Sequence, residues 1–386
     1  ENHHNSLDDL ELLKKNGFSD IQVGALTNHT PAEIRTIRNE RNLKPVYKVV
    51  DTCAGEFNAE TPYSYSTYES TDDIQPLNGP KVMILGGGPN RIGQGIEFDY
   101  CCVQAVYGLR EAGFKSIMVN CNPETVSTDF DLADRLYFEP ITFEDIMNII
   151  EFEKPDGVLV QFGGQTPLKI AEQLTKEGVK ILGTSSASID LAENREEFAR
   201  IIKKLKIQIP EYCIAKNYDE IINFSEVAQF PVLVRPSYVL GGRAMQIVYN
   251  KEQLVDYVFR SAEATNDHPI LIDQFIENAF EFDVDALCDG KEVFIAGIMQ
   301  HIEEAGVHSG DSSCVIPPYD MSDKIKKDII DMTTKLALEL NVIGLINLQF
   351  AVKGNEAYVL EVNPRSSRTV PFVSKYSNVP LANIAA

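Results

Sequence analysis

Residues with oxygen-bearing side chains stand close together near the end of the chain. Two runs rich in aliphatic and aromatic residues flank the segment Lys353–Glu356 and predict a β-hairpin. We expect a three-residue loop at Gly354–Glu356, which places Gln349 opposite Glu361. The period of two along a strand then puts Asn363 on the same face. The pattern predicts a polar face of two amides and one carboxylate, which Val359 shares, backed by an apolar face with Leu360 and Val362.

Oxygen ligands of this kind suit Mg²⁺ or Mn²⁺, which bind a few protein groups while keeping nucleotide phosphates as ligands. Two arginines follow, Arg365 and Arg368, and their planar guanidinium groups suit anionic oxygens. Metal ligands followed by arginines are an arrangement for moving a phosphoryl group between anions. The alternative without a function is a polar hairpin face that ends in an Asn-Pro turn. It is the favoured explanation for each residue taken alone, and the metal site is the favoured explanation for the whole set.

The composition limits the function classes that such a site can serve. The 386 residues include 57 acidic and 35 basic side chains, which give a net charge of −22. No long Lys/Arg run offsets this charge, which argues against a nucleic-acid partner. The sequence has no long apolar run, so we expect no membrane span and no membrane partner. The chain opens on Glu1 without a signal peptide, and we expect it to be part of a longer protein.

The seven cysteines are scattered, and their spacing matches no metal site. An odd number without a C-x-x-C pair favours buried thiols over disulfides, so we expect a reducing compartment and a cytoplasmic location. His301 and His308 could suggest zinc, but no cysteine stands at ligand spacing and no H-E-x-x-H occurs. A polar loop near a nucleotide is the favoured interpretation of this stretch.

The elements that must position these residues divide the chain into parts. Residues 1–73 predict a helical segment, with a helix that starts at Thr30-Pro31, followed by an extended tail. Residues 74–193 alternate strands, at 82–85, 117–119, 158–160 and 181–182, with helices, one of which runs from about Glu97 to Glu111. The alternation predicts an open, mostly parallel sheet, and hence an α/β fold class. Residues 194–265 predict a smaller α/β unit, and residues 266–386 supply further strands and the hairpin.

Glycine-rich loops stand at two places where phosphates could bind. The loop Gly86–Gly95 invites a dinucleotide interpretation, but Pro89 interrupts the turn and Arg91 replaces a third glycine. No acid ends the second strand, so we disfavour a nicotinamide or flavin cofactor. The loop at Gly241-Gly242 joins two strands and predicts a hairpin that closes over a triphosphate, with Arg235 adding charge from the strand.

Taken together, these segments closely resemble the large chain of carbamoyl phosphate synthetase, and the resemblance covers nearly all of the sequence. The motifs that carry it are long and specific: Gly86–Cys102, Asn120–Ser127, Gln161–Pro167, Val234–Met245, His301–Ser312 and Glu361–Arg365. That family's large chain has two homologous synthetase halves, each with an ATP-grasp fold. Arg368–Lys375 and Pro45–Ala54 look like the second half.

The resemblance implies an architecture and a reaction. Residues 1–73 would end a helical oligomerisation domain, and residues 74–193 would form a Rossmann-like pre-ATP-grasp domain. An ATP-grasp lid subdomain would span 194–265, and a truncated ATP-grasp C-terminal subdomain would span 266–386. The implied reaction is phosphorylation of carbamate by ATP, which gives carbamoyl phosphate and ADP and serves pyrimidine and arginine biosynthesis.

The resemblance also implies site residues by position. The nucleotide would lie among Arg195, Arg235, Gly241, Gly242, Gln274, Ile276, Glu281, Gly306, Val307, His308, Ser309, Gln349 and Glu361. Two Mg²⁺ or Mn²⁺ ions would bind Gln349, Glu361 and Asn363. Carbamate and the transferred phosphoryl group would meet Arg365 and Arg368, with Asn363 beside them. A K⁺ ion would lie at His301, Glu303, Val307 and Ser312.

The partners implied by the resemblance are the first synthetase half and the regulatory domain of the same full-length chain. A glutaminase small subunit is also implied, as is a homo-oligomer formed through the N-terminal segment. Two other functions stay open: another ATP-grasp carboxylate ligase, such as biotin carboxylase, or a nucleotide-binding assembly module without catalysis. The opening helical segment and the loop at 301–313 weigh against the first, and the complete ligand and arginine set weighs against the second.

Overall fold

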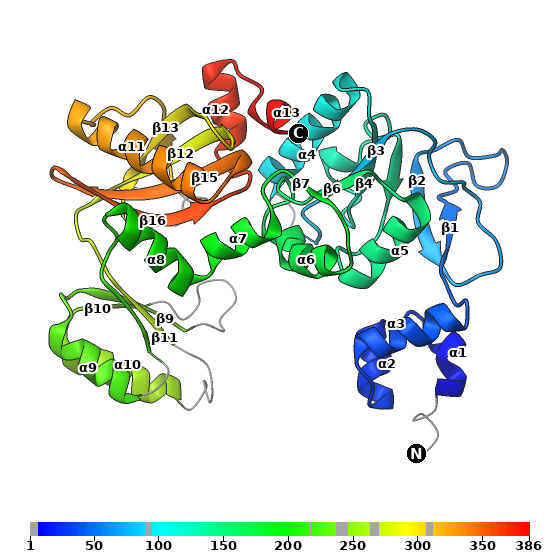
Figure 1. Cartoon of the computed structure of the whole chain (residues 1–386), viewed down its shortest axis with the longest axis horizontal. Coiled ribbons are helices and arrows are strands. Elements are labelled where there is room, and N and C mark those ends of the chain that lie inside the picture. Colours follow the sequence, from blue (N-terminus) through cyan, green and yellow to red (C-terminus); the bar gives the residue numbers. More distant parts are fainter. Residues whose placement is uncertain (1–6, 90–94, 216–217, 237–245, 263–269, 306–311) are drawn as a thin grey trace.

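The computed structural model describes residues 7–89, 95–215, 218–236, 246–262, 270–305 and 312–386. Three sheets with covering helices organise this part of the chain, and a small helical segment lies at its N-terminal end (Figure 1). Within these ranges no helix is both long and apolar enough to cross a membrane. The seven cysteines all fall within the described ranges and are free thiols.

Short helices form the N-terminal segment: α1 (Leu10–Lys15), α2 (Asp20–Thr27) and α3 (Pro31–Glu40). The predicted helix start at Thr30 and Pro31 is confirmed, since Thr30 forms a capping box with Glu33. Helix α2 was not predicted, although Ser19 and Gln22 form the same kind of box. Each helix contributes one fully buried apolar residue to a small shared core.

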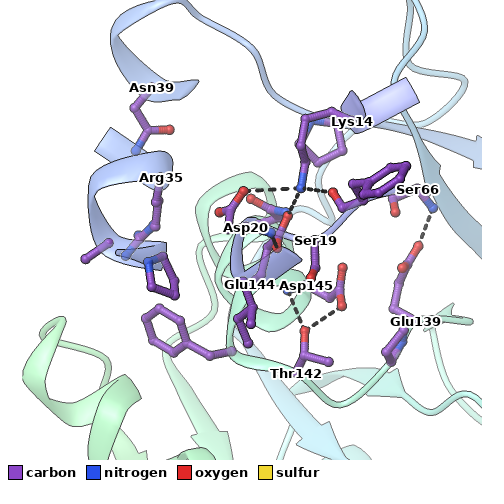
Figure 2. A pocket seen from close by; sticks show the side chains of 18 of the residues that line it. Lys14, Ser19, Asp20, Arg35, Asn39, Ser66, Glu139, Thr142, Glu144 and Asp145 are labelled. Carbon is purple, nitrogen blue, oxygen red and sulfur yellow. Dashed lines mark hydrogen bonds and ion pairs between the residues drawn. The ribbon is translucent and has the colours of Figure 1, made fainter. Parts of the chain in front are cut away.

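Buried charges hold this segment against the next domain. Arg38 donates two hydrogen bonds to Asp20, from Nε at 2.8 Å and from Nη2 at 2.6 Å. Lys14 pairs with Asp20 at 3.2 Å and with Glu144 of α5 (Phe143–Glu153), and Figure 2 shows these three side chains converging. Because Lys14 and Arg38 are almost fully buried, their partners must offset the cost of desolvation.

The first sheet has the strand order β1-β2-β5-β4-β3-β6-β7. Only β1 and β2 are antiparallel neighbours, and the other pairs are parallel. Its strands are β1 (Val46–Val49), β2 (Tyr63–Thr67), β3 (Lys81–Leu85), β4 (Lys115–Val119), β5 (Arg135–Tyr137), β6 (Gly157–Leu159) and β7 (Ile181–Leu182). The stretch predicted as an extended tail thus supplies β1 and β2, which extend the sheet because β2 pairs with β5 and β1 pairs with β2.

Helices α4 (Ile96–Glu111), α5 and α6 (Gln165–Lys176) connect these strands, and α7 (Ser186–Glu193) follows the last of them. The helix predicted from Glu97 to Glu111 is α4. The loops after β3 and β6 touch, because a Cβ on Gly163 would lie 2.4 Å from the carbonyl oxygen of Gly86. No other residue type fits there without moving the backbone, so glycine at 163 keeps the two loops in contact.

The second sheet has the order β10-β9-β11-β8 with antiparallel neighbours. Its elements are β8 (Tyr212–Ala215), α9 (Tyr218–Val227), β9 (Val232–Pro236), β10 (Gln246–Val248), α10 (Lys251–Ala262) and β11 (Ile270–Gln274). The two strands predicted around the glycine-rich loop are β9 and β10. Strand β11 belongs to this sheet, although the sequence assigned it to the following subdomain.

The third sheet has the order β14-β13-β12-β15-β16, again with antiparallel neighbours. Its strands are β12 (Phe280–Asp289), β13 (Val293–Glu304), β14 (Cys314–Val315), β15 (Ile343–Lys353) and β16 (Glu356–Asn363). Its helices are α8 (Arg195–Leu205), α11 (Asp323–Glu339), α12 (Val370–Ser377) and α13 (Leu381–Ala385). One face of β12 and β15 forms an apolar core with α8 and α11.

The first and third sheets are joined by a shared core. Val106 of α4 and Val373 of α12 belong to one buried cluster, which also contains Leu345 of β15. The contact is close at Gly108, where a Cβ would lie 2.5 Å from the carbonyl oxygen of Asn383. Interiors packed this tightly resist deformation, so the two domains are held in one relative position.

Two buried carboxyl groups beside the N-terminal helices make the free energy of unfolding depend on pH. Glu139 is 6% exposed and accepts a hydrogen bond from the backbone N–H of Ser66 (Figure 2). Burial raises the pKa of Glu139 to about 7 and that of Asp145 to about 6. Because the folded chain binds these protons more tightly than the unfolded chain, the free energy of unfolding falls as pH rises towards 7.

We predict that Glu139→Gln removes the Glu139 share of this pH dependence. At pH 8 the variant should exceed the parent chain in free energy of unfolding by on the order of 2–3 kcal/mol, and at pH 5 the two should differ little. Urea unfolding across this pH range measures the effect. The control Glu172→Gln, on the exposed surface of α6, should shift neither value. An equal gain at both pH values would contradict the assignment.

Candidate nucleotide and metal site

The β15–β16 hairpin decides which side chains face the candidate site. Its loop has two residues, 354–355, rather than the predicted three, because strand pairing continues to the end of each strand. The prediction that Gln349 lies opposite Glu361 is nevertheless confirmed. A β-bulge at Leu360 inserts the residue that the shorter loop leaves out.

The bulge also exchanges the faces of β16. Ala357 and Val359 enter the apolar core before the bulge, and Val362 enters it afterwards. Glu361 therefore lies on the opposite, polar face. The predicted uninterrupted alternation, with Leu360 on the apolar face and Val359 on the polar face, was wrong. Val359 is 1% exposed and Leu360 is 39% exposed.

Two rows of polar residues cross the strands β12, β15 and β16 on this face. Strand pairing aligns one row as Asp283–Gln349–Glu361 and the other as Asp285–Asn347–Asn363. Three of the six were predicted from the sequence as ligands, and Asp283, Asp285 and Asn347 were not. The sequence could have indicated these three residues, because each is a polar residue that alternates with apolar residues along a strand.

A cavity of about 530 Å³ opens where the second and third sheets meet. Six of the predicted residues line it: Gln274, Ile276, Glu281, Gln349, Glu361 and Asn363. Gln165 and Glu193 also line it and were not predicted. The structure thus brings together residues from β11, β12, β15 and β16, with additional groups from α6 and α7.

A larger cavity of about 980 Å³ lies between the N-terminal helices and the loop before α5 (Figure 2). It contains none of the predicted ligands. Lys14 and Arg35 line it, but Lys14 is paired with acids, and Arg35 pairs with Glu151 and Glu177 at 2.8 and 2.9 Å. Since both cations are already paired with acids, we assign the phosphate chemistry to the smaller cavity.

Arg365 stands beside the smaller cavity. Its Nη2 donates to Oδ1 of Asn363 at 3.0 Å, its Nη1 donates to the carbonyl of Ser366 at 2.7 Å, and its guanidinium lies 5.7 Å from the ring centre of Phe98. Burial lowers the pKa of Arg365, but a guanidinium stays charged at neutral pH. Arg368 is half-exposed and has no hydrogen-bond or ion-pair partner within the described residues.

His301 does not offer its imidazole to a cation. The ring is 2% exposed, and its Nε2 donates to Oδ2 of Asp283 at 2.6 Å. Although desolvation lowers the pKa, the hydrogen bond to Asp283 raises the pKa of His301 to about 10. Glu303 accepts the backbone N–H of Ser313 at 2.7 Å, which brings Glu303 close to the turn that contains Ser312.

The other predicted residues are only partly described. Arg195 is the first residue of α8, and Arg235 lies in β9 opposite Leu271. The side chains of these two arginines lie outside the described part of the chain. The following predicted residues lie outside it completely: Gly241, Gly242, Gly306, Val307, His308 and Ser309.

The oxygen donors of the polar face fit a hard divalent cation. Gln349 and Glu361 are cross-strand neighbours on the cavity wall, and Asn363 follows Glu361 on the same face. Within the described residues no group of three or more His, Cys, Asp or Glu side chains could hold a metal ion. A set with one carboxylate and two amides suits Mg²⁺, which keeps water and phosphate ligands, better than a softer metal.

Solved structures with the same fold include enzymes that bind nucleotides. The biotin carboxylase domain of 2-oxoglutarate carboxylase from Hydrogenobacter thermophilus, in complex with MgADP and bicarbonate, has a TM-score of 0.62 and 17% identity, covering 78% of this chain and 68% of that one. N5-carboxyaminoimidazole ribonucleotide synthetase from Thermotoga maritima has a TM-score of 0.57 and 18% identity, covering 80% and 76%. The fold and the cavity between its sheets define an ATP-grasp protein.

Two family models match the sequence: the carbamoyl phosphate synthase preATP-grasp domain over residues 78–191, and the carbamoyl-phosphate synthase L chain, ATP binding domain over residues 194–386. The carbamoyl phosphate synthase large chains of Archaeoglobus fulgidus and Pasteurella multocida are 60% and 58% identical over 97% and 99% of this chain. This chain belongs to the carbamoyl phosphate synthase large-chain family. It spans 35–36% of the length of these two relatives.

We predict that Glu361→Gln weakens binding of Mg-nucleotide at least about tenfold, because the amide loses the charge that attracts the metal. The side chain is exposed, so the unliganded chain should change in stability by no more than about 0.5 kcal/mol. Thermal unfolding with ADP, with and without Mg²⁺, measures both quantities.

Glu356→Gln is the matched control, since Glu356 is an exposed carboxylate at the other end of β16. This control should keep the full Mg²⁺-dependent shift in melting temperature. The metal assignment is wrong if Glu361→Gln keeps it as well.

Proposed function

We propose that this chain transfers the γ-phosphoryl group of ATP to carbamate, forming carbamoyl phosphate and ADP. The observation that carries the proposal is the alignment of Gln349, Glu361 and Asn363 on one cavity wall with Arg365 at its edge. Such a wall can hold the metal–phosphate complex and place cations where negative charge is transferred. Membership of the family supports an ATP-dependent ligase, and the particular phosphorylation step is our inference.

Gln349, Glu361 and Asn363 would hold two Mg²⁺ or Mn²⁺ ions, and Gln274, Ile276 and Glu281 would surround the nucleotide. Bound divalent ions supply charge neutralisation at the β- and γ-phosphates. Ile276 would act through its backbone. Further nucleotide contacts are proposed for the residues that are only partly described or not described: Arg195, Arg235, Gly241, Gly242, Gly306, Val307, His308 and Ser309.

Arg365 and Arg368 would bind carbamate and the phosphoryl group. Carbamate is already an anion, so its attack on phosphorus needs no general base. The step needs two anions held in line and the added charge stabilised. Arg365 supports this role because its hydrogen bond to Asn363 ties the guanidinium to the metal side of the site. Arg368 supports it as a partly exposed cation that has no hydrogen-bond or ion-pair partner within the described residues.

A K⁺ ion is proposed at His301, Glu303, Val307 and Ser312. Because the imidazole of His301 is protonated and bonded to Asp283, this residue would contribute through its main chain. Carbamate would come from the first synthetase half of a full-length chain, with ammonia from a glutaminase subunit. A regulatory domain and self-association through the N-terminal helices belong to the same proposal, as do a cytoplasmic location and a role in arginine and pyrimidine synthesis.

The partial back reaction tests the proposal on this chain. With ADP, Mg²⁺ and carbamoyl phosphate it should form ATP, and with bicarbonate and ATP it should release no ADP above background. The second assay separates carbamate phosphorylation from activation of bicarbonate, which an ATP-grasp carboxylase-like ligase would perform. ADP release that depends on bicarbonate, without ATP formation from carbamoyl phosphate, would overturn the proposed substrate.

We predict that Arg365→Ala and Arg368→Ala each lower the rate of ATP formation by roughly 30- to 1,000-fold. This range corresponds to a loss of ~2–4 kcal/mol of transition-state stabilisation from one preorganised donor. Arg200→Ala removes an exposed arginine of α8 and should leave the rate unchanged. Coupled detection of ATP measures the three variants in one assay. Unchanged rates for both active-site variants would exclude the two arginines from the reaction.

A further inference from the structure

The loop between β16 and α12 alternates two kinds of side chain. Ser366, Ser367 and Thr369 are buried, with exposed fractions of 0%, 5% and 9%. Arg365 and Arg368 are half-buried. The three hydroxyl side chains of the loop are therefore more buried than the two arginines beside them. What those hydroxyl groups bind decides where the arginines stand.

Ser366 binds the first domain. Its Oγ lies 3.0 Å from the carbonyl oxygen of Gln161 and 3.1 Å from that of Phe162, and its backbone N–H also donates to Gln161 at 3.0 Å. These carbonyls belong to the segment that follows β6. One side of the loop is thereby attached to the parallel sheet.

Ser367 and Thr369 bind one carboxylate, Asp285 of β12. Ser367 Oγ donates to Oδ1 of Asp285 at 2.6 Å, and Thr369 Oγ1 donates to Oδ2 at 2.5 Å. Asn347 donates to Oδ1 as well, at 3.0 Å. Thr369 is also the N-cap residue of α12, yet its hydroxyl makes no capping bond there. The hydroxyl is used for Asp285 instead of the helix.

Stability does not explain a carboxylate at this position. Asp285 is 1% exposed, and its burial raises its pKa to about 6. Replacing a buried charge and its partners by apolar residues is often neutral or stabilising. An apolar residue in place of Asp285 would therefore give the folded chain similar or greater stability. The carboxylate does provide two oriented oxygens that accept hydrogen bonds from one loop in one geometry.

The same hydrogen bonds extend towards the nucleotide cavity. Asn347 donates to Asp283 at 3.2 Å as well as to Asp285, and Asp283 accepts the hydrogen bond from His301. Nδ1 of His301 lies 3.5 Å from Glu281, which lines the cavity. A continuous buried row of polar contacts therefore runs from the nucleotide wall to the loop with the arginines.

We propose that Asp285 is a positioning residue that sets Arg365 and Arg368 by holding the loop between them through Ser367 and Thr369. This inference rests on the proposed function, because it gives the two arginines their role. Asp285 does not line the nucleotide cavity. Its effect reaches the reaction only through the place of the loop, and a misplacement near 1 Å in an active site can lower a rate by about 100-fold.

A matched pair of variants isolates the hydroxyl of Thr369. Thr369→Val keeps the shape and removes the hydroxyl, while Thr369→Ser keeps the hydroxyl and removes a methyl group. We expect Thr369→Val and Asp285→Asn to lower kcat/KM for carbamoyl phosphate by about 10- to 100-fold with the KM for ADP unchanged. Thr369→Ser should stay within about threefold of the parent chain. A role in folding alone would affect both substrates equally.

Limited proteolysis measures how readily the loop opens to a protease, and this measurement does not depend on the proposed reaction. Trypsin cleaves after arginine, so the bonds Arg365–Ser366 and Arg368–Thr369 report directly on the loop. Loss of one charge-assisted hydrogen bond should speed cleavage after Arg365 by about tenfold in Thr369→Val, and not in Thr369→Ser. Thr333→Val, which removes a buried hydroxyl of α11 that has no partner within the described residues, controls for general loosening.

Kinetics and proteolysis together distinguish failure of the proposed function from failure of the positioning role of Asp285. If the parent chain forms no ATP from carbamoyl phosphate, the proposed function fails, and proteolysis alone then decides the role of Asp285. If Thr369→Val and Asp285→Asn match the parent chain in cleavage and kinetics, the positioning role is overturned. The positioning role is also overturned if Thr369→Ser and Thr369→Val lose activity and resistance to trypsin equally, because only Thr369→Val lacks the hydroxyl. Should Asp285→Asn not fold, the threonine pair still gives the answer.

Discussion

The alignment of β15 with its two neighbours is the constraint on which the site depends. Asp283 and Asp285 stand on one side of this strand, and Glu361 and Asn363 stand on the other. A shift by one residue would turn every member of a row to the opposite face. The bulge at Leu360 is therefore a part of the site, because it moves the end of β16 onto the polar face while its beginning stays in the core.

A sheet that carries such polar rows must be stabilised elsewhere. The other face of the third sheet provides this stabilisation. There, buried Phe282 of β12 and Phe350 of β15 pack against α8 and α11. Apolar burial on one face can offset the cost of acids and amides on the other. The polar face also satisfies itself, since Asn347 donates to both Asp283 and Asp285. Gln349 and Glu361 lie at the cavity wall, where they face a ligand rather than the core.

The position of the first domain against this face completes the crevice. A shared apolar cluster, the close approach of Gly108 to Asn383, and the bonds from Ser366 to the segment after β6 all join the two sheets. Phe98 of α4 then lies beside the guanidinium of Arg365. An arginine held between two domains in this way needs little reorganisation when an anion binds, which is the condition for strong electrostatic stabilisation.

The sequence by itself determined the local elements and the cross-strand partner of Gln349. Capping residues, strand alternation and glycine loops depend on neighbours a few positions away. The start of α3, the extent of α4 and four of the seven strands of the first sheet (β3, β4, β6 and β7) were therefore predictable, whereas β5 was missed. The long motifs also identified the family. Only the tertiary structure decided the bulge at Leu360, the addition of β1 and β2 to the sheet, and the commitment of the His301 ring to Asp283. It alone paired Asp285 with Asn347 and Ser367, 62 and 82 positions away, because contacts at such separations are set by how strands pair and domains pack.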